Sequence, residues 1–164
     1  MFKLPARLAV CTFALAAALG LSACASKSEA SGADARQVAA ALANKRAAVT
    51  FYEQFFNDHD LSAAERYIAP GYIQHNPQVA NGREAFVQTF AGIFAKQPQR
   101  RSTIKRVVAE GSYVMLHVHA VAGPEDRGVA VVDIFRFDPE GKIVEHWDVI
   151  QPVPEKTASG NGVF

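Results

Sequence analysis

The sequence predicts an α+β protein, with N-terminal helices packed on one face of a curved, mainly antiparallel sheet. Apolar residues recur at helical spacing up to residue 96, and from residue 103 onward apolar and polar residues alternate in four segments joined by turns. A chain that forms its helices first and a meander of strands afterwards is typical of this class. With 164 residues, 49% of them hydrophobic, the chain is long enough for one domain with a substantial core.

Residues 1–23 are predicted to be a lipoprotein signal peptide. Lys3 and Arg7 give a basic start, and residues 8–19 form an apolar run that is too short for a comfortable membrane-spanning helix. Residues 21–24, Leu-Ser-Ala-Cys, resemble a bacterial lipobox, in which cleavage precedes the cysteine and the new N-terminal Cys24 carries the lipid. An ordinary secretory signal cleaved nearby is the alternative.

This interpretation decides the cysteine chemistry and the location. Cys11 leaves with the signal and Cys24 is lipidated, so the mature chain has no thiol for catalysis or zinc binding. We expect a domain anchored through its lipid in the bacterial envelope and facing the periplasm. The outer membrane is favoured, because Ala25 stands where an aspartate would retain a lipoprotein in the inner membrane.

The domain is predicted to span residues 34–154, between two irregular segments. Residues 25–33 are small and polar and are expected to form a flexible tether, and residues 155–164 a loose tail. The net charge is +1 and the basic residues are spread among acidic ones, so we expect no nucleic-acid partner.

Three helices are expected before the strands. The first covers residues 35–57 with Asp34 as N-cap, the second covers residues 62–67 with Ser62 and Glu65 as a capping box, and the third covers residues 82–96. Residues 72–77 should form a short extended piece, because the residue before Pro77 avoids the helical region.

Four strands are expected after residue 98, at residues 103–110, 112–122, 129–137 and 142–151. The last two are joined by Asp-Pro-Glu-Gly at residues 138–141, where proline presets one corner and Gly141 takes the left-handed position. The outward sheet face would carry Val114, Leu116, Val118, Val132 and Ile134. Such an apolar surface predicts a homodimer through the face of Leu116, Val118, Val132 and Ile134.

The strand at residues 129–137 contains an unusual acid. Alternation places Asp133 on one face with Val131, Phe135 and Phe137, where a buried carboxylate is costly unless it is paired, hydrogen-bonded or protonated. The preceding strand places His117 and His119 on a single face. If the two strands pair, as sequential strands commonly do, we expect imidazole and carboxylate to share a face.

Four pieces of sequence resemble the SnoaL-like polyketide cyclases of the nuclear transport factor 2-like superfamily. They are residues 72–77 (YIQHNP), 117–119 (HVH), 133–136 (DIFR) and 141–148 (GKIVEHWD), and the resemblance covers residues 49–154. It implies a cone-shaped cavity and acid–base chemistry by a sheet aspartate without metal or other cofactor. Asp133 matches that aspartate, and His119 matches the nearby imidazole.

The function predicted is acid–base catalysis of an aldol, isomerisation or hydration step on a small apolar carbonyl compound. Asp133 and His119 would be catalytic, and His75, His117, Trp147 and Tyr72 would line the substrate cavity. A one-residue register slip would exchange Trp147 for His146. Arg136 and Asp148 are expected on the opposite face.

Three alternatives stay open for these residues. The Asp–His pair can be purely structural, and the cavity can bind an apolar small molecule without converting it. A metal site is the third alternative, with His75, His117, His119 and Asp133 as ligands.

Overall fold

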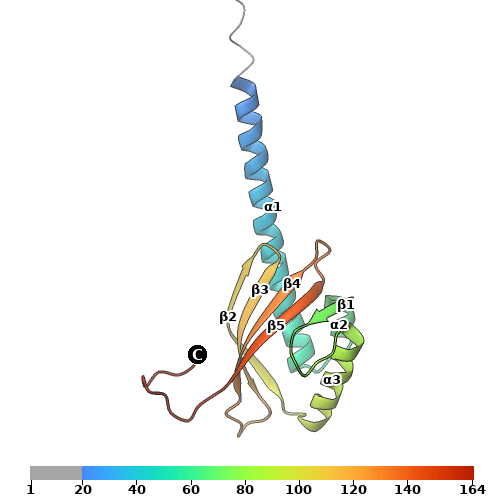
Figure 1. Cartoon of the computed structure of the whole chain (residues 1–164), viewed down its shortest axis with the longest axis vertical. Coiled ribbons are helices and arrows are strands. Elements are labelled where there is room, and N and C mark those ends of the chain that lie inside the picture. Colours follow the sequence, from blue (N-terminus) through green and yellow to red (C-terminus); the bar gives the residue numbers. More distant parts are fainter. Residues whose placement is uncertain (1–19) are drawn as a thin grey trace, which may run out of the picture. The chain divides into compact units, whose positions relative to one another are not determined.

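The computed structural model describes the fold of residues 20–164 and the side chains of residues 32–164 (Figure 1). Residues 1–19 of the predicted signal peptide, with Lys3, Arg7 and Cys11, lie outside the described residues. The helical elements are α1 (Gly20–Tyr52), the π-helical turn η1 (Glu53–Asn57), α2 (Ala63–Tyr67) and α3 (Arg83–Lys96). The strands are β1 (Ile68–Gln74), β2 (Arg101–Glu110), β3 (Tyr113–Val121), β4 (Val129–Phe137) and β5 (Ile143–Pro152).

The five strands form one mixed sheet in the order β1-β5-β4-β3-β2. Strands β2 to β5 are an antiparallel meander, and β1 joins its edge parallel to β5. The predicted α+β class is therefore confirmed. The turn at residues 138–141 also forms as expected, with Gly141 at a φ of 78° and its N–H donating to the Asp138 carbonyl.

The core lies between one sheet face and the helices (Figure 1). Phe51 and Phe55, from the end of α1 and from η1, are fully buried, and Phe86 of α3 packs 4.8 Å from the Phe55 ring. Phe135 of β4 meets Phe51 edge-on, with ring centroids 6.1 Å apart. Aromatic packing of this kind fixes the helices on the sheet.

The inner face of the sheet carries three of the residues that we expected outside, all from β3. Val114, Leu116 and Val118 are fully buried, and Leu116 lies directly opposite Asp133 in the β3–β4 pair. Residues opposite each other in an antiparallel pair share a face. The surface predicted for dimerisation is thus wrong as a single face, because Leu116 and Val118 point inward while Val132 and Ile134 point outward.

The outer face still exposes apolar side chains, Val108, Tyr113, Met115 and Val149 among them. A homodimer through this face remains a prediction, and sedimentation of a Val132→Glu variant tests it.

At the edge toward β2, the Phe164 ring lies 4.6 Å from that of His119 and 5.4 Å from that of His117. The end of the tail, predicted to be loose, therefore packs on the sheet.

Several helix boundaries differ from the expectation. Helix α1 begins at Gly20, so the predicted tether at residues 25–33 and Asp34 lie inside it; the alanines of this stretch are strong helix formers. Ser62 forms no side-chain cap; instead, its hydroxyl donates to Asp60 Oδ1 at 2.6 Å. Pro70 and Gly71 belong to β1, which begins as soon as α2 ends.

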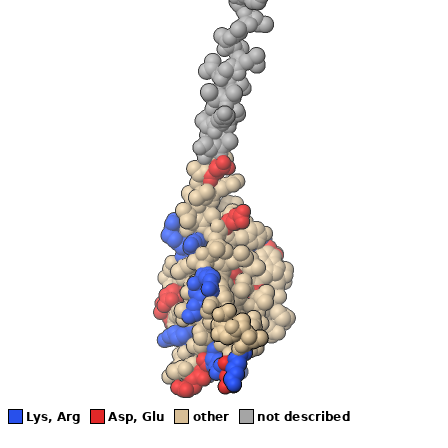
Figure 2. All heavy atoms as spheres, turned by 90° about the vertical axis from the view of Figure 1, so that its left-hand side faces the viewer, with Lys and Arg blue, Asp and Glu red and all other residues tan. Residues whose placement is uncertain are grey.

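In the part of the chain that the structure describes, no helix is both long and apolar enough to span a membrane. On the face in Figure 2, basic and acidic side chains are interspersed among uncharged ones.

Candidate active site

Asp133 is held by two groups, one from a helix and one from the neighbouring strand. Tyr52, at the end of α1, donates its phenol hydrogen to Asp133 Oδ2 at 2.7 Å. His146 of β5 places Nε2 2.8 Å from Asp133 Oδ1. The side chains of Asp133 and His146 are only 8% and 6% exposed. The carboxylate thus has a hydrogen-bond partner on each oxygen, which offsets part of the cost of its burial.

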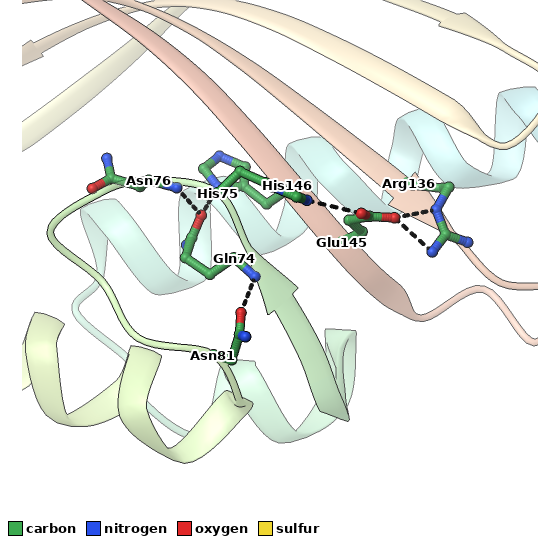
Figure 3. Close-up of polar contacts among 7 residues, drawn as sticks. All are labelled: Gln74, His75, Asn76, Asn81, Arg136, Glu145 and His146. Carbon is green, nitrogen blue, oxygen red and sulfur yellow. Dashed lines mark hydrogen bonds and ion pairs between the residues drawn. The ribbon is translucent and has the colours of Figure 1, made fainter.

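Gln74, at the end of β1, orients His146 (Figure 3). Its Oε1 accepts a hydrogen bond from the Asn76 backbone N–H at 2.9 Å and lies 2.8 Å from His146 Nδ1. A backbone N–H can only donate, so this amide atom must be the carbonyl oxygen. His146 Nδ1 therefore carries a hydrogen and donates it to Gln74.

This assignment fixes the proton count of the pair. With Nδ1 protonated, neutral His146 presents a lone pair at Nε2 and cannot donate to a carboxylate. The 2.8 Å contact with Asp133 Oδ1 then requires one further proton, on Nε2 or on the carboxyl oxygen. Asp133 and His146 share that proton and can act as acid or base from the same position.

Two buried phenols stay protonated beside the pair. Burial raises the pKa of Tyr52 well above its usual value, and the charge of Asp133 raises it further. Burial likewise raises the pKa of Tyr72, and the charge of Asp133 raises it further. The Tyr72 oxygen accepts a hydrogen bond from Gln74 Nε2 at 3.2 Å, which leaves its own hydrogen available as a donor.

A cavity of about 230 Å³ opens beside these groups. Aromatic and aliphatic side chains make most of its wall, and polar groups come from the strands, from α1 and α3 and from the connecting segments. The lining residues are Tyr52, Phe56, Tyr72, Gln74, Asn76, Gln78, Val79, Phe86, Thr89, Phe90, Ile93, Arg100, Ser102, Ala120, Val131, Asp133, Phe135, His146, Asp148 and Ile150. A small, mostly apolar cavity with a few convergent polar groups is typical of a small-molecule site.

Asp148 also faces the cavity, directly opposite Asp133 in the β4–β5 pair. Its Oδ2 accepts a hydrogen bond from Asn76 Nδ2 at 2.6 Å. Ligand atoms of Asp133, His146 and Asp148 lie within 4.8 Å of one another, so these three side chains are a set that could hold a divalent ion. The separation of 2.8 Å between His146 Nε2 and Asp133 Oδ1 fits a shared proton without rearrangement, whereas a metal would have to displace that proton.

The predicted partnership of Asp133 with His119 is wrong. His119 lies opposite Ala130 and His117 opposite Val132, both on the outer face. His119 Nε2 lies 2.8 Å from the Arg127 carbonyl, and His117 Nδ1 lies 3.1 Å from Arg106 Nη1. The two histidines do share a face, as alternation requires, but it is not the face of Asp133.

His75 and Trp147 also lie outside the cavity. Their rings stack at 4.7 Å. His75 Nε2 lies 2.9 Å from Glu145 Oε1, and Arg136 binds the other oxygen of this carboxylate, Oε2 (Figure 3). These placements separate the four ligands proposed for the metal site. Of the predicted cavity residues other than Asp133, Tyr72 is the one placed correctly.

The error has a local cause in the sheet register. A bulge between Arg136 and Phe137 shifts the pairing, so Trp147 falls opposite Ile134 and His146 opposite Phe135. The one-residue slip considered for Trp147 and His146 is therefore what occurs, and Asp148 moves inward with it. Arg136 lies on the outer face as predicted.

Sequence reasoning missed the contributions of Tyr52, Gln74, Asn76 and Arg100 to the cavity. For Tyr52 and Gln74, the sequence does contain a weak indication of a role in the cavity. Tyr52 belongs to the apolar stripe of the first helix, where a phenol needs a buried partner. Gln74 lies in an extended segment next to a strand-edge histidine.

The sequence profile of the SnoaL-like domain matches residues 48–146, so the chain belongs to this family. A candidate polyketide cyclase from Bacillus cereus is similar in structure, with a TM-score of 0.58, 18% identity and coverage of 66% of this chain and 74% of that one. A SnoaL-like candidate isomerase from Agrobacterium tumefaciens has a TM-score of 0.55 at 12% identity and covers 69% and 98%.

A nuclear transport factor 2-like protein from Mesorhizobium loti has a TM-score of 0.56 at 23% identity and covers 68% and 93%. Similarity at these identities establishes the nuclear transport factor 2-like fold. The comparison with curated proteins finds no match.

Proposed function

We propose that this protein is an acid–base enzyme that abstracts a proton next to the carbonyl of a small, largely apolar compound. The observation that carries the proposal is the 2.8 Å contact between Asp133 Oδ1 and His146 Nε2 at the wall of an apolar cavity. A carboxyl–imidazole pair with one mobile proton can take a proton from carbon and return it elsewhere. Aldol, isomerisation and hydration steps all begin or end with such a transfer.

In the proposed step, Asp133 as carboxylate removes the α-hydrogen, and the C–H electron pair moves into the carbonyl to form an enolate. The phenol O–H of Tyr72 donates a hydrogen bond to the enolate oxygen and keeps its proton, as an oxyanion-hole donor does. His146 holds the other proton of the pair and is kept in its tautomer by Gln74. Tyr52 positions Asp133 through Oδ2.

Hydrogen exchange at carbon tests the proposal without knowledge of the natural substrate. Small aryl ketones such as 1-indanone in D₂O should lose their α-proton NMR signals faster with the protein than without it. Asp133→Asn should slow this exchange by on the order of 10²-fold or more, as expected for a lost general base. Glu145→Gln is the matched control, because it removes a carboxylate on the outer face of the neighbouring strand. Equal rates for wild type and Asp133→Asn would contradict the proposal.

We also propose that the enzyme is exported and anchored through a lipid on Cys24, facing the periplasm. The lipobox-like residues 21–24 and the basic and apolar residues before them support this location. Cys24→Ala should move the protein from the membrane fraction to the soluble fraction of cells. If the variant stays in the membrane fraction, the lipid anchor is wrong.

Binding without turnover is the second candidate, favoured by the apolar wall of Phe56, Phe86, Phe90 and Ile93. A co-purified apolar compound released unchanged, together with no exchange activity, would favour it. A stoichiometric metal in purified protein would instead favour the site at Asp133, His146 and Asp148.

A further inference from the structure

Arg100 brings a positive charge to the wall of the cavity. It lies in the connection between α3 and β2 and lines the same space as Tyr52 and Asp133. Gln97 holds it twice: its backbone carbonyl accepts from the Arg100 N–H at 3.0 Å, and its Oε1 accepts from Nη1 at 2.9 Å. The bond from Nη1 restrains the guanidinium on the side of Gln97.

The same guanidinium is incompletely satisfied. Arg100 Nε is buried and has no hydrogen-bond partner among the described residues. None of the ion pairs formed by the described side chains includes Arg100. A buried donor without an acceptor is costly, and a charged one more so. Because Nε is enclosed, a ligand at this wall would reach the guanidinium through Nη2, which has no hydrogen-bond partner among the described residues.

The neighbouring acids do not fill this role. Asp133 shares a proton with His146, so this pair carries no net charge, and Asp148 is engaged by Asn76. Asp126 is a third acid near Arg100, and both of its oxygens accept from backbone N–H groups, those of Ala122 and Gly128. The charge of Arg100 also reaches Tyr52, where it partly offsets the rise in the pKa. Because Arg100 and Asp133 line the same cavity, a ligand that contacts Arg100 would lie near Asp133.

We infer that the ligand of this cavity is an apolar carboxylate, with its carboxylate bound to Arg100 and its apolar body against Phe56, Phe90 and Ile93. Guanidinium and carboxylate match in geometry and charge, and the pair strengthens where water is excluded. This inference specifies the substrate class of the proposed function, in which the ligand would be a keto acid. The binding preference itself does not require turnover.

Binding of a matched acid and amide tests the inference. The probes are 3-phenylpropanoate and 3-phenylpropanamide, which differ little except in charge, measured by calorimetric titration at pH 7. Wild type should bind the acid at least about tenfold more tightly than the amide, as expected for hydrogen bonds to a charged partner. Arg100→Gln should abolish this preference by weakening the acid while leaving amide binding within about threefold.

The control is Arg106→Gln, which removes the same charge from the outer face of β2 and should keep the preference. If Arg100→Gln does not fold, Arg100→Lys replaces it and should reduce the preference several-fold, because a lysine has no planar fork. A preference unchanged by the Arg100 variant, equal wild-type affinities, or no binding of either probe at millimolar concentration would overturn the inference.

Asp133→Asn separates this inference from the proposed function. The variant should lose α-proton exchange and keep its preference for the acid. Loss of the preference in Asp133→Asn would overturn the assignment of the anion site to Arg100. If wild type shows the preference but no exchange, the proposed enzyme is wrong and the anion site stands.

Discussion

Two histidine–carboxylate pairs lie on opposite faces of the same part of the sheet. His146 meets Asp133 at 2.8 Å, and His75 meets Glu145 at 2.9 Å. Glu145 and His146 are adjacent in β5, and His75 directly follows Gln74, the residue that binds His146. The contact distances are nearly equal, but the side chains are 6% and 8% exposed in the first pair and 42% and 16% in the second.

The difference shows that the environment, more than the residue types, decides what such a pair can do. On the outer face, Arg136 also binds Glu145. The hydrogen bond with His75 lowers the pKa of Glu145 most, and the hydrogen bond from Arg136 lowers it further. Glu145 is thereby kept ionised and unsuited to act as a base near neutral pH. On the inner face, the 2.8 Å contact between Asp133 and the enclosed His146 requires a shared proton, and both groups line the cavity.

The largest expected difference between the two pairs is in stability. His146→Ala leaves Asp133 buried with only Tyr52 as partner, and breaking a buried pair costs about 3–5 kcal/mol. His75→Ala should cost several-fold less, because water replaces the lost contact on the outer face. Urea unfolding of the two variants at pH 7 measures both free energies. Equal losses would show that burial does not distinguish the pairs.

A smaller effect is expected from the second partner of Asp133. Tyr52→Phe removes a hydrogen bond to a buried carboxylate and should lower the free energy of unfolding by about 1.5–3 kcal/mol at pH 7. The folded pKa of Tyr52 is raised above its unfolded value of about 10. Its stabilising contribution is therefore complete below pH 10 and is lost as the pH rises above it. The gap between wild type and Tyr52→Phe should narrow between pH 9 and pH 11.

Tyr113→Phe is the control for this pH dependence, since Tyr113 is an exposed phenol on the outer face. It should leave the alkaline part of the stability curve unchanged. A gap for Tyr52→Phe that stays constant across this range would show that the phenol ionises as readily in the folded protein as in the unfolded chain.

The smallest effect is expected on the outer face. The folded pKa of Glu145 is lowered, so its contribution is present above the unfolded value and is lost as the pH falls through the folded value. Glu145→Gln should thus be less stable than wild type at pH 7 and approach it below pH 4. The expected difference decreases with added salt, because the pair is partly exposed. Thermal unfolding between pH 3 and pH 7 measures it, and a difference that grows toward pH 3 would contradict the assignment.

The sequence predicts which side chains of a strand share a face, because they alternate along it. This prediction is correct within every strand that carries a candidate residue. Asp133 stands out in the sequence because alternation places it on one face with Val131, Phe135 and Phe137, and the structure buries it with them. His117 and His119 share a face, also as expected. The prediction fails at the pairing of the two strands. Two strands that each alternate can pair in either of two registers, and the choice decides whether the histidines share the face of Asp133.

The residues themselves determined the α+β class, the four long strands, the turn at Gly141 and the oddity of a buried aspartate. Each of these depends on a local period or on a single backbone preference. Tertiary structure alone decided which imidazole reaches Asp133. A single bulge in the β4–β5 pair turns His146 inward and Trp147 outward, and the packing of α1 and the α3–β2 connection brings Tyr52 and Arg100 to the same cavity. Register and helix packing depend on the summed burial of many distant side chains, and the sequence pattern around any one residue does not contain that sum.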